Sequence, residues 1–211
     1  DFTPISIVSS VDAMLVAHPS LPVRNVRELI ALAKARPGAL SYGTAGAATN
    51  PHICGELLNH LGKINLFAVH YKGGGAATTA TISGETPLFF SNTISDALPM
   101  VEAKRLRALG VTGAKRSPVA PQIPTLAESG LPGYEFSTWH VFAAPAATPR
   151  AIVKEINDKV RASLKTPEAV QRWRERSVEI IANTPDEAAA FLKSEVQKWR
   201  AVVRGRGMKK A

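Results

Sequence analysis

Cysteine is almost missing from this sequence, since Cys54 is the only one in 211 residues. A single cysteine excludes an internal disulfide, and we expect it to lie in a helix as a small apolar core residue. The five histidines are not spaced as metal ligands, because no two of them stand four residues apart. The sequence therefore predicts neither a metal site nor a cofactor.

Long apolar runs are absent too, and none approaches the ~20 residues that a membrane-spanning helix needs. The chain starts at Asp1 without a signal peptide, which is compatible with processing or with a fragment boundary. A hydrophobic content of 45%, with 15 glycines and 15 prolines, indicates a folded protein with many short loops. Its length allows one large domain or two small ones.

Negative charge is scarce, since 17 acidic against 26 basic residues give a formal net charge of +9. Basic residues cluster at 104–107, 172–176 and 204–210, without an RNA-binding or helix–turn–helix pattern. We interpret these clusters as solvated helix faces and a frayed tail, and expect no nucleic-acid partner. The positive field still favours an anionic ligand.

The patterns of common catalytic sites are also missing. Acidic residues are scattered, mostly at predicted helix surfaces, and no Gly-x-Ser-x-Gly nucleophile elbow occurs. We therefore predict that the chain is not an enzyme. An enzyme acting on a small carboxylic acid is the weaker alternative.

The most informative segment covers residues 40–56, which predict a short strand, a loop of small residues and a helix. Asn50 is the expected N-cap of this helix, with Pro51 at its first position. Free N–H groups and the positive end of the helix dipole favour an anion there, above all a carboxylate. The hydroxyls of Thr44 and Thr49 add further donors. The alternative is an ordinary strand-to-helix turn.

Two further strand ends have the same character. A predicted strand at 65–71 runs into Lys72 and three glycines before a second helix, and a strand at 86–90 ends in Ser91 and Asn92. In open α/β sheets, ligands bind outside the carboxyl ends of the strands. Three small or polar strand ends within 50 residues therefore favour a binding site in a mainly parallel sheet.

The rest of the chain predicts more helix than sheet. A short helix is expected at 125–130, and Thr148-Pro149, Thr166-Pro167 and Thr184-Pro185 each predict a helix start. The last helix carries a 3.6-residue stripe typical of a buried face. So little sheet beside these helices suggests that the first half of their domain is missing. The stripe residues are Ala188, Leu192, Val196, Trp199 and Val203.

A set of short motifs runs through the chain in an order found in a known family. The motifs are DFTPI (1–5), LSYGTAG (40–46), His52 with GELL (55–58), YKGG (71–74), KRLRAL (104–109), AKRSP (114–118), IPTLAE (123–128), GLPG (130–133) and APAATP (144–149). By this ordered set, the chain resembles the extracytoplasmic solute receptors of tripartite tricarboxylate transporters, often called Bug receptors. The likeness covers essentially all 211 residues.

The resemblance implies an α/β fold of the periplasmic-binding-protein type II kind, a clamshell of two lobes. It implies that residues 1–9 cross over from the first lobe and that 10–135 form one complete α/β lobe, the second. Residues 136–211 are then the return strand and the C-terminal helices of the first lobe. The opening part of the first lobe, with its ligand loop, and the signal peptide of the precursor are absent by this likeness.

The family's second-lobe ligand loop falls on residues 45–50, where Ala47, Ala48 and Pro51 depart from a pattern richer in Ser and Gly. The family often has Asp at Ser91, and the loss of that carboxylate argues against an amino-acid ligand. For three candidates we keep an alternative: a surface position for His52, a solvated side chain for Lys72 and a core position for Trp139. The candidate ligand residues are Thr44, Ala45, Gly46, Ala47, Ala48, Thr49, Asn50, His52, Lys72, Gly73, Gly74, Ser91, Asn92 and Trp139.

By this resemblance, the chain is expected to be a periplasmic receptor for a small di-, tri- or aromatic carboxylate. It would deliver this acid to membrane transporter subunits after lobe closure. Another copy of the chain, or the absent N-terminal segment, is a further expected partner. The main alternative function is the effector-sensing domain of a transcription regulator, which shares the broad architecture.

Overall fold

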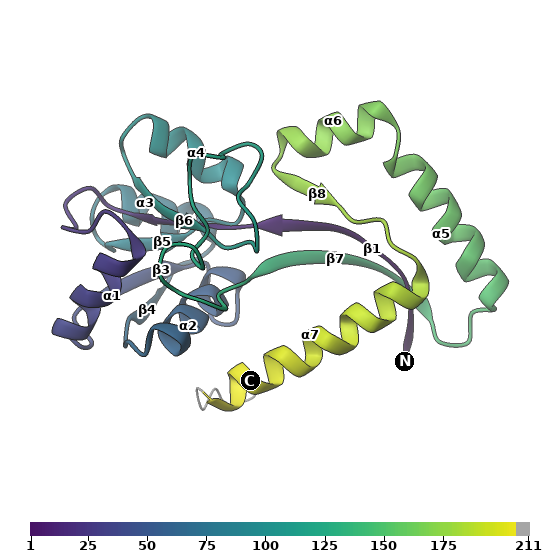
Figure 1. Cartoon of the computed structure of the whole chain (residues 1–211), viewed down its shortest axis with the longest axis horizontal. Helices are drawn as coiled ribbons and strands as arrows, with labels where there is room; N and C mark the ends of the chain where they lie inside the picture. Colours follow the sequence, from purple (N-terminus) through teal and green to yellow (C-terminus); the bar gives the residue numbers. More distant parts are fainter. Residues whose placement is uncertain (206–211) are drawn as a thin grey trace. The chain divides into compact units, whose positions relative to one another are not determined.

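The computed structural model describes residues 1–205, with side chains through Arg200, and the chain forms two compact units. Unit 2 is Asp12–Ser137. Unit 1 combines Asp1–Val11 with the chain from Thr138 onward. Each unit has a sheet of its own, so the two are described separately (Figure 1).

Unit 2 is a five-stranded sheet in the order β4-β3-β5-β2-β6, with four helices. Strand β3 pairs parallel with β4 and β5, whereas β2 pairs antiparallel with β5 and β6. Four strands therefore run one way, as the alternating pattern predicted, and β2 runs against them. The elements are β2 (Met14–Ala17), α1 (Val26–Ala35), β3 (Ser41–Thr44), α2 (Asn50–Gly62), β4 (Phe67–His70), α3 (Gly74–Ile82), β5 (Leu88–Phe90), α4 (Ile94–Glu102) and β6 (Arg107–Val111).

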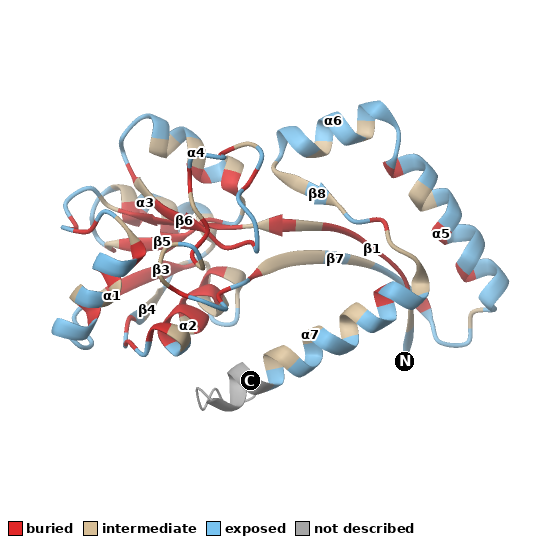
Figure 2. Ribbon diagram, in the orientation of Figure 1, coloured by how far each residue is buried: buried red, intermediate tan, exposed pale blue. Residues whose placement is uncertain are grey.

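Helices cover both faces of this sheet, α3 and α4 on one side and α1 and α2 on the other (Figure 1). Val16 and Phe89 of the sheet pack in one buried cluster with Ala77 of α3 and further residues of α4. Toward the other helices, Leu29 and Leu58 are fully buried. The central strands are accordingly buried almost throughout (Figure 2). Unit 2 thus has the two-sided core that a mainly parallel sheet requires.

Unit 1 is a three-stranded sheet in the order β7-β1-β8 with three helices, and β1 pairs antiparallel with β8. Among its described residues, two small clusters of buried apolar side chains are Ile5 with Ala144 and Val153, and Val8 with Leu164 and Ala182. The elements are β1 (Phe2–Asp12), β7 (Ser137–Pro145), α5 (Arg150–Leu164), α6 (Pro167–Glu175), β8 (Val178–Ile180) and α7 (Pro185–Gly205).

A buried asparagine supplements this small core. Asn157 of α5 is 2% exposed, and its amide donates to the carbonyl oxygens of Ile5 and Asn183, both at 2.8 Å. The side-chain oxygen of Asn183 in turn accepts the N–H of Ile7 at 2.7 Å. These bonds fasten α5 and the segment before α7 to strand β1.

The apolar stripe of α7 is buried only at its start. Ala188 is fully buried and Leu192 and Trp199 are half-buried, but Val196 is 49% exposed. Val203 lies outside the residues whose side chains are described. The described residues therefore leave the stripe uncovered at Val196, because a periodic stripe predicts an apolar face but not that the chain supplies a partner for it.

Two predicted helix starts are one residue out of place. Helix α2 begins at Asn50, so Thr49 is its N-cap and Pro51 its second residue. Helix α5 begins at Arg150, so Pro149 is its N-cap. The starts of α6 and α7 were predicted correctly, since both begin at the proline after the threonine.

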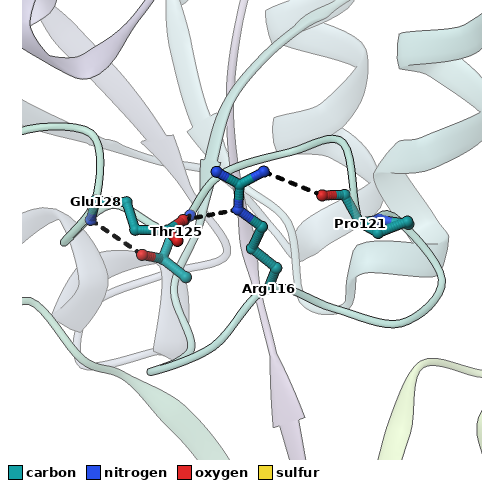
Figure 3. A network of polar contacts seen from close by, with 4 residues as sticks. All are labelled: Arg116, Pro121, Thr125 and Glu128. Carbon is teal, nitrogen blue, oxygen red and sulfur yellow. Dashed lines mark hydrogen bonds and ion pairs between the residues drawn. The ribbon is translucent and has the colours of Figure 1, made fainter.

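The predicted short helix at 125–130 is not formed, because Thr125 bridges to Val111 and residues 126–130 form turns. Contacts of the kind that cap a helix start do form, because the N–H of Glu128 donates to the Thr125 hydroxyl at 3.0 Å and its carboxylate accepts the Thr125 N–H at 2.8 Å. The same carboxylate pairs with Arg116 at 2.9 Å, and Arg116 donates to the Pro121 carbonyl (Figure 3). The carboxylate therefore holds a loop together here instead of starting a helix.

Candidate functional site

The three polar strand ends singled out in the sequence lie at the same side of the unit 2 sheet, at the carboxyl ends of its parallel strands; this side is called the sheet edge below. In the parallel ladder Thr44 stands opposite His70, and Gly43 of the same strand stands opposite Phe89 of β5. The loops that follow β3, β4 and β5 therefore leave the sheet side by side. The N–H of Tyr71 donates to the Thr44 carbonyl at 3.0 Å and ties the second of these loops to the first.

The first of these loops, residues 45–50, is called the small-residue loop below. Gly46 has φ +128° and Ala48 has φ +58°, so the backbone turns twice through conformations that L side chains rarely adopt. Its N–H groups have several partners close by: Gly46 donates to the Thr44 hydroxyl at 3.2 Å, Ala48 to Nδ1 of His52 at 3.0 Å, and Thr49 to the Gly46 carbonyl at 3.5 Å. The loop is folded on itself.

The helices that follow the first two loops start without a side-chain cap. The Thr49 hydroxyl donates back to the Gly46 carbonyl at 2.7 Å, and α3 follows Gly73, which has no side chain and φ +104°. In α1 and α4 of the same unit, by contrast, Asn25 and Thr93 accept a hydrogen bond from an N–H of the first turn. The starts of α2 and α3 are thus the two in unit 2 that lack a side-chain cap, and the positive end of each helix dipole favours an acceptor such as an anion there.

Two imidazole rings lie against the small-residue loop. The rings of His52 and His70 meet edge to face, with centroids 5.0 Å apart. Nδ1 of His70 is 2.6 Å from the Thr44 hydroxyl. Burial lowers the pKa of His52, and His70 lowers it further, whereas Glu56 one turn along α2 raises it.

A cavity of about 250 Å³ lies at the starts of α3 and α4. Three of the predicted ligand residues line it, namely Gly74, Ser91 and Asn92. The Asn92 side chain lies so close to Gly74 that a Cβ atom added to Gly74 would come within 2.6 Å of the Asn92 amide nitrogen. Ser91 is 3% exposed; its hydroxyl accepts the N–H of Met14 at 3.0 Å and donates to the Thr93 carbonyl at 2.7 Å, so it serves the backbone. The lining residues are Val16, Gly74, Gly75, Thr78, Phe89, Ser91, Asn92, Asp96, Ala97 and Leu106.

The structure therefore divides the predicted residues into four groups. Thr44, the small-residue loop and His52 lie together at the end of β3, while Gly74, Ser91 and Asn92 line the cavity. Lys72 and Gly73 lie in the loop between β4 and α3, with Lys72 exposed. Trp139 belongs to unit 1, where its ring meets Phe191 edge to face at 5.7 Å.

Sequence reasoning missed His70, Thr78 and Asp96. His70 ends β4 directly opposite Thr44, and only the strand register could have shown this. Thr78 lies one turn into α3 and Asp96 in the first turn of α4, so both follow closely on a strand-end loop that the sequence already indicated. Cys54 is fully buried, as expected, and this burial raises the pKa of its thiol.

Among the residues that the structure describes, no group of three or more His, Cys, Asp or Glu is arranged to hold a metal ion. None of the described helices is both long and apolar enough to cross a membrane.

Comparison with known families gives a match over nearly the whole chain, because residues 1–208 fit the model of the tripartite tricarboxylate transporter family receptor. Protein BugT of Bordetella pertussis is 30% identical over 209 residues, covering 99% of this chain and 64% of the relative. A UPF0065 protein from the tcbD-tcbE intergenic region of Pseudomonas sp. is 31% identical over 204 residues, covering 96% of this chain and 60% of the relative. The chain thus spans about 60% of the length of these relatives.

Solved structures agree with this match. Rpa4515 of R. palustris with adipate superposes with a TM-score of 0.84 at 33% identity, over 98% of this chain and 69% of the other. The periplasmic binding protein BugD superposes with a TM-score of 0.82 at 28% identity, over 100% of this chain and 71% of the other. MatC of Rhodopseudomonas palustris with bound malate superposes with a TM-score of 0.80 at 26% identity, over 96% of this chain and 69% of the other. The predicted α/β fold of the periplasmic-binding-protein type is confirmed.

Proposed function

The chain belongs to the tripartite tricarboxylate transporter receptor family, and from this premise we propose that it binds a small organic carboxylate. Two of the similar solved structures carry dicarboxylates by name, adipate and malate. A dicarboxylate is therefore the first class of ligand to test, with tricarboxylates and aromatic acids next.

The observation that carries the proposal is the pair of uncapped helix starts at one sheet edge. Helices α2 and α3 follow adjacent parallel strands, and neither has a side-chain cap, whereas α1 and α4 do. A carboxylate oxygen is a strong acceptor for first-turn N–H groups and is favoured by the helix dipole. Our proposal places one carboxylate of the ligand at these starts, with the Thr49 hydroxyl and Asn50 beside it.

Binding of this kind needs no proton transfer, so we propose a receptor rather than an enzyme. We further propose that the chain acts in the periplasm, that it delivers its acid to membrane transporter subunits, and that it binds no nucleic acid. In the domain arrangement that we propose, unit 2 is the second lobe and unit 1 is part of the first. The predicted boundaries at residues 10 and 136 lie within two residues of the borders of unit 2.

A thermal-shift screen tests the ligand class. A ligand that binds only the folded state raises the melting temperature by mass action. We expect adipate or malate to raise it and the matching diamide to have no effect. Stabilisation by none of the mono-, di-, tri- or aromatic carboxylates would remove the proposal.

Substitution of Thr49 tests the site itself. Thr49→Ala removes the hydroxyl that holds the small-residue loop by donating to the Gly46 carbonyl at 2.7 Å. This change should weaken acid binding by about 0.5–1.5 kcal/mol, the net worth of one hydrogen bond, whereas Thr49→Ser keeps the hydroxyl and serves as the matched control. Calorimetry measures both affinities, and mass analysis of the recovered acid checks that it is unchanged. Equal affinities for the two variants would place the ligand elsewhere, and a modified acid would overturn the receptor assignment.

A further inference from the structure

The small-residue loop is held by the side chain of a residue outside it. Nδ1 of His52, in the first turn of α2, accepts the backbone N–H of Ala48 at 3.0 Å. Ala48 has φ +58°, a left-handed conformation that an alanine side chain disfavours. The bond to His52 therefore fixes a turn that the sequence of the loop does not itself favour.

This bond is compatible with only one charge state of His52. A backbone N–H can only donate, so Nδ1 must offer its lone pair and the imidazole must be neutral, with its proton on Nε2. Protonation of Nδ1 would leave two N–H donors facing each other with no acceptor between them, and the bond would break. The structure thus couples the conformation of the loop to the charge of one histidine.

The surroundings of His52 favour the neutral form on balance. Partial burial disfavours a positive charge on the ring most strongly, and His70, at the end of β4, meets the ring edge-on and acts in the same direction. Glu56 of α2 acts the other way, and Tyr42 of β3 donates to the Glu56 carboxylate at 3.0 Å and contacts the His52 carbonyl at 3.3 Å. The pKa of His52 is accordingly lowered from its ordinary value of 6.5, and the Ala48 bond is lost as the pH falls through that lowered value.

We propose that neutral His52 is a positioning residue, which holds the small-residue loop in its binding shape without touching the ligand. The proposal rests on the carboxylate site proposed above. A positioning role and direct contact predict opposite effects of acid on ligand affinity. An imidazolium in contact with the carboxylate would raise the affinity as the pH falls, whereas loss of the bond between His52 and Ala48 lowers it.

The first test reads the loop and needs no ligand. Amide hydrogen exchange and the NMR shift of the Ala48 amide are followed from pH 8 to pH 5 in the chain and in two variants. In the unchanged chain, we expect exchange, corrected for its intrinsic pH dependence, to become at least about fivefold faster below the transition, the factor for one ordinary hydrogen bond. His52→Asn places its side-chain oxygen near the position of Nδ1 and should keep the amide protected at every pH. His52→Ala should expose it at every pH.

His60→Asn is the matched control, because His60 is an exposed histidine on the same helix, and its amide profile should equal that of the unchanged chain. An Ala48 amide that is indifferent to pH and to His52→Ala would overturn the proposal.

The second test uses adipate as the probe, by calorimetry at pH 8 and pH 5. Affinity should fall on acidification in the unchanged chain and stay level in His52→Asn. A rise on acidification would show that the imidazolium contacts the acid, and would overturn the positioning role. Absence of adipate binding at both pH values would count against the carboxylate site, while the amide result would still decide whether His52 holds the loop.

Discussion

The two units bury their apolar side chains very differently. In unit 2, helices on both faces of a five-stranded sheet enclose residues such as Leu15, Leu58 and Phe90, all fully buried. In unit 1, the buried clusters are small, such as Val8 with Leu164 and Ala182, and large side chains on its helices, such as Ile152 at 47% and Val170 at 47%, face solvent. Of the large hydrophobic side chains found exposed, all but Phe67 belong to unit 1.

This difference shows that a unit's content of secondary structure does not measure how much it stabilises the fold. Unit 1 has long helices, but helices are stabilised mainly by the apolar face that they bury. Unit 2 therefore supplies most of the hydrophobic stabilisation, and it also carries the sheet edge with the uncapped helix starts. Unit 1 depends more on polar ties such as those of Asn157.

The chain offers a spectroscopic way to separate the units. Its three tryptophans, Trp139, Trp173 and Trp199, all belong to unit 1, whereas all three tyrosines belong to unit 2. Tryptophan emission therefore follows unit 1, and far-UV circular dichroism follows both. We expect the tryptophan transition in urea to come first, and coincident transitions would show that the units unfold as one.

The largest effect should come from the core of unit 2. Leu58→Ala removes a fully buried side chain of α2 and should lower the free energy of unfolding by about 2–5 kcal/mol. Ile152→Ala, at a residue that is 47% exposed in unit 1, should cost less than about 0.5 kcal/mol. Urea titration by circular dichroism measures both. Similar costs for the two variants would mean that Ile152 has a partner in solution.

A matched pair of buried asparagines should give the next largest effect. Asn157 ties α5 to β1 in unit 1, and Asn59 of α2 bonds both backbone groups of Leu66 in unit 2, at 2.9 and 2.8 Å. Each change to alanine leaves buried backbone groups unsatisfied and should cost about 1–3 kcal/mol. Asn157→Ala should lower the urea midpoint of the tryptophan transition of unit 1, and Asn59→Ala should lower that of the later transition of unit 2. If Asn59→Ala shifted both transitions equally, the two units would be one cooperative body.

Local features of the fold were predictable from the sequence. The starts of α1, α6 and α7 follow from side chains that cap N–H groups three residues on, and the strand–loop–helix units of unit 2 follow from its alternating patterns. Residues 125–130 show the limit of this reasoning. The capping contacts of Thr125 formed there, but too little helix followed for them to start one.

Contacts between strands were beyond sequence reasoning. The approach of His70 to Thr44 depends on the β3–β4 register, and the use of the Ser91 hydroxyl by the Met14 backbone depends on which strand lies next to β5. The exposure of Val196 could not be predicted either, because a stripe predicts that a face is apolar but not which of its residues this chain covers. The family itself came from the order of motifs, and the residues of the ligand site stay a prediction.

The smallest effect is expected from a motif that occurs in both units, a threonine whose N–H is accepted by a glutamate three residues later. Glu128 in unit 2 accepts the Thr125 N–H, and Glu187 in unit 1 accepts the Thr184 N–H, each at 2.8 Å. These backbone bonds lower the pKa of both carboxyls, and Arg116 lowers that of Glu128 further.

A lowered pKa in the folded state means that each carboxylate stabilises the fold above its ordinary pKa of 4.5, and that this contribution is lost as the pH falls through the lowered value. Glu128→Gln and Glu187→Gln should each flatten the acid limb of the stability curve. Because both groups are exposed, the change is small and is best read as a difference between urea midpoints at pH 6 and pH 3. Glu187→Gln should flatten the tryptophan curve alone, and Glu128→Gln the later transition alone. A flattening of both transitions by either variant would show that acid unfolds the units together, and would remove the independence on which the comparison of the two units rests.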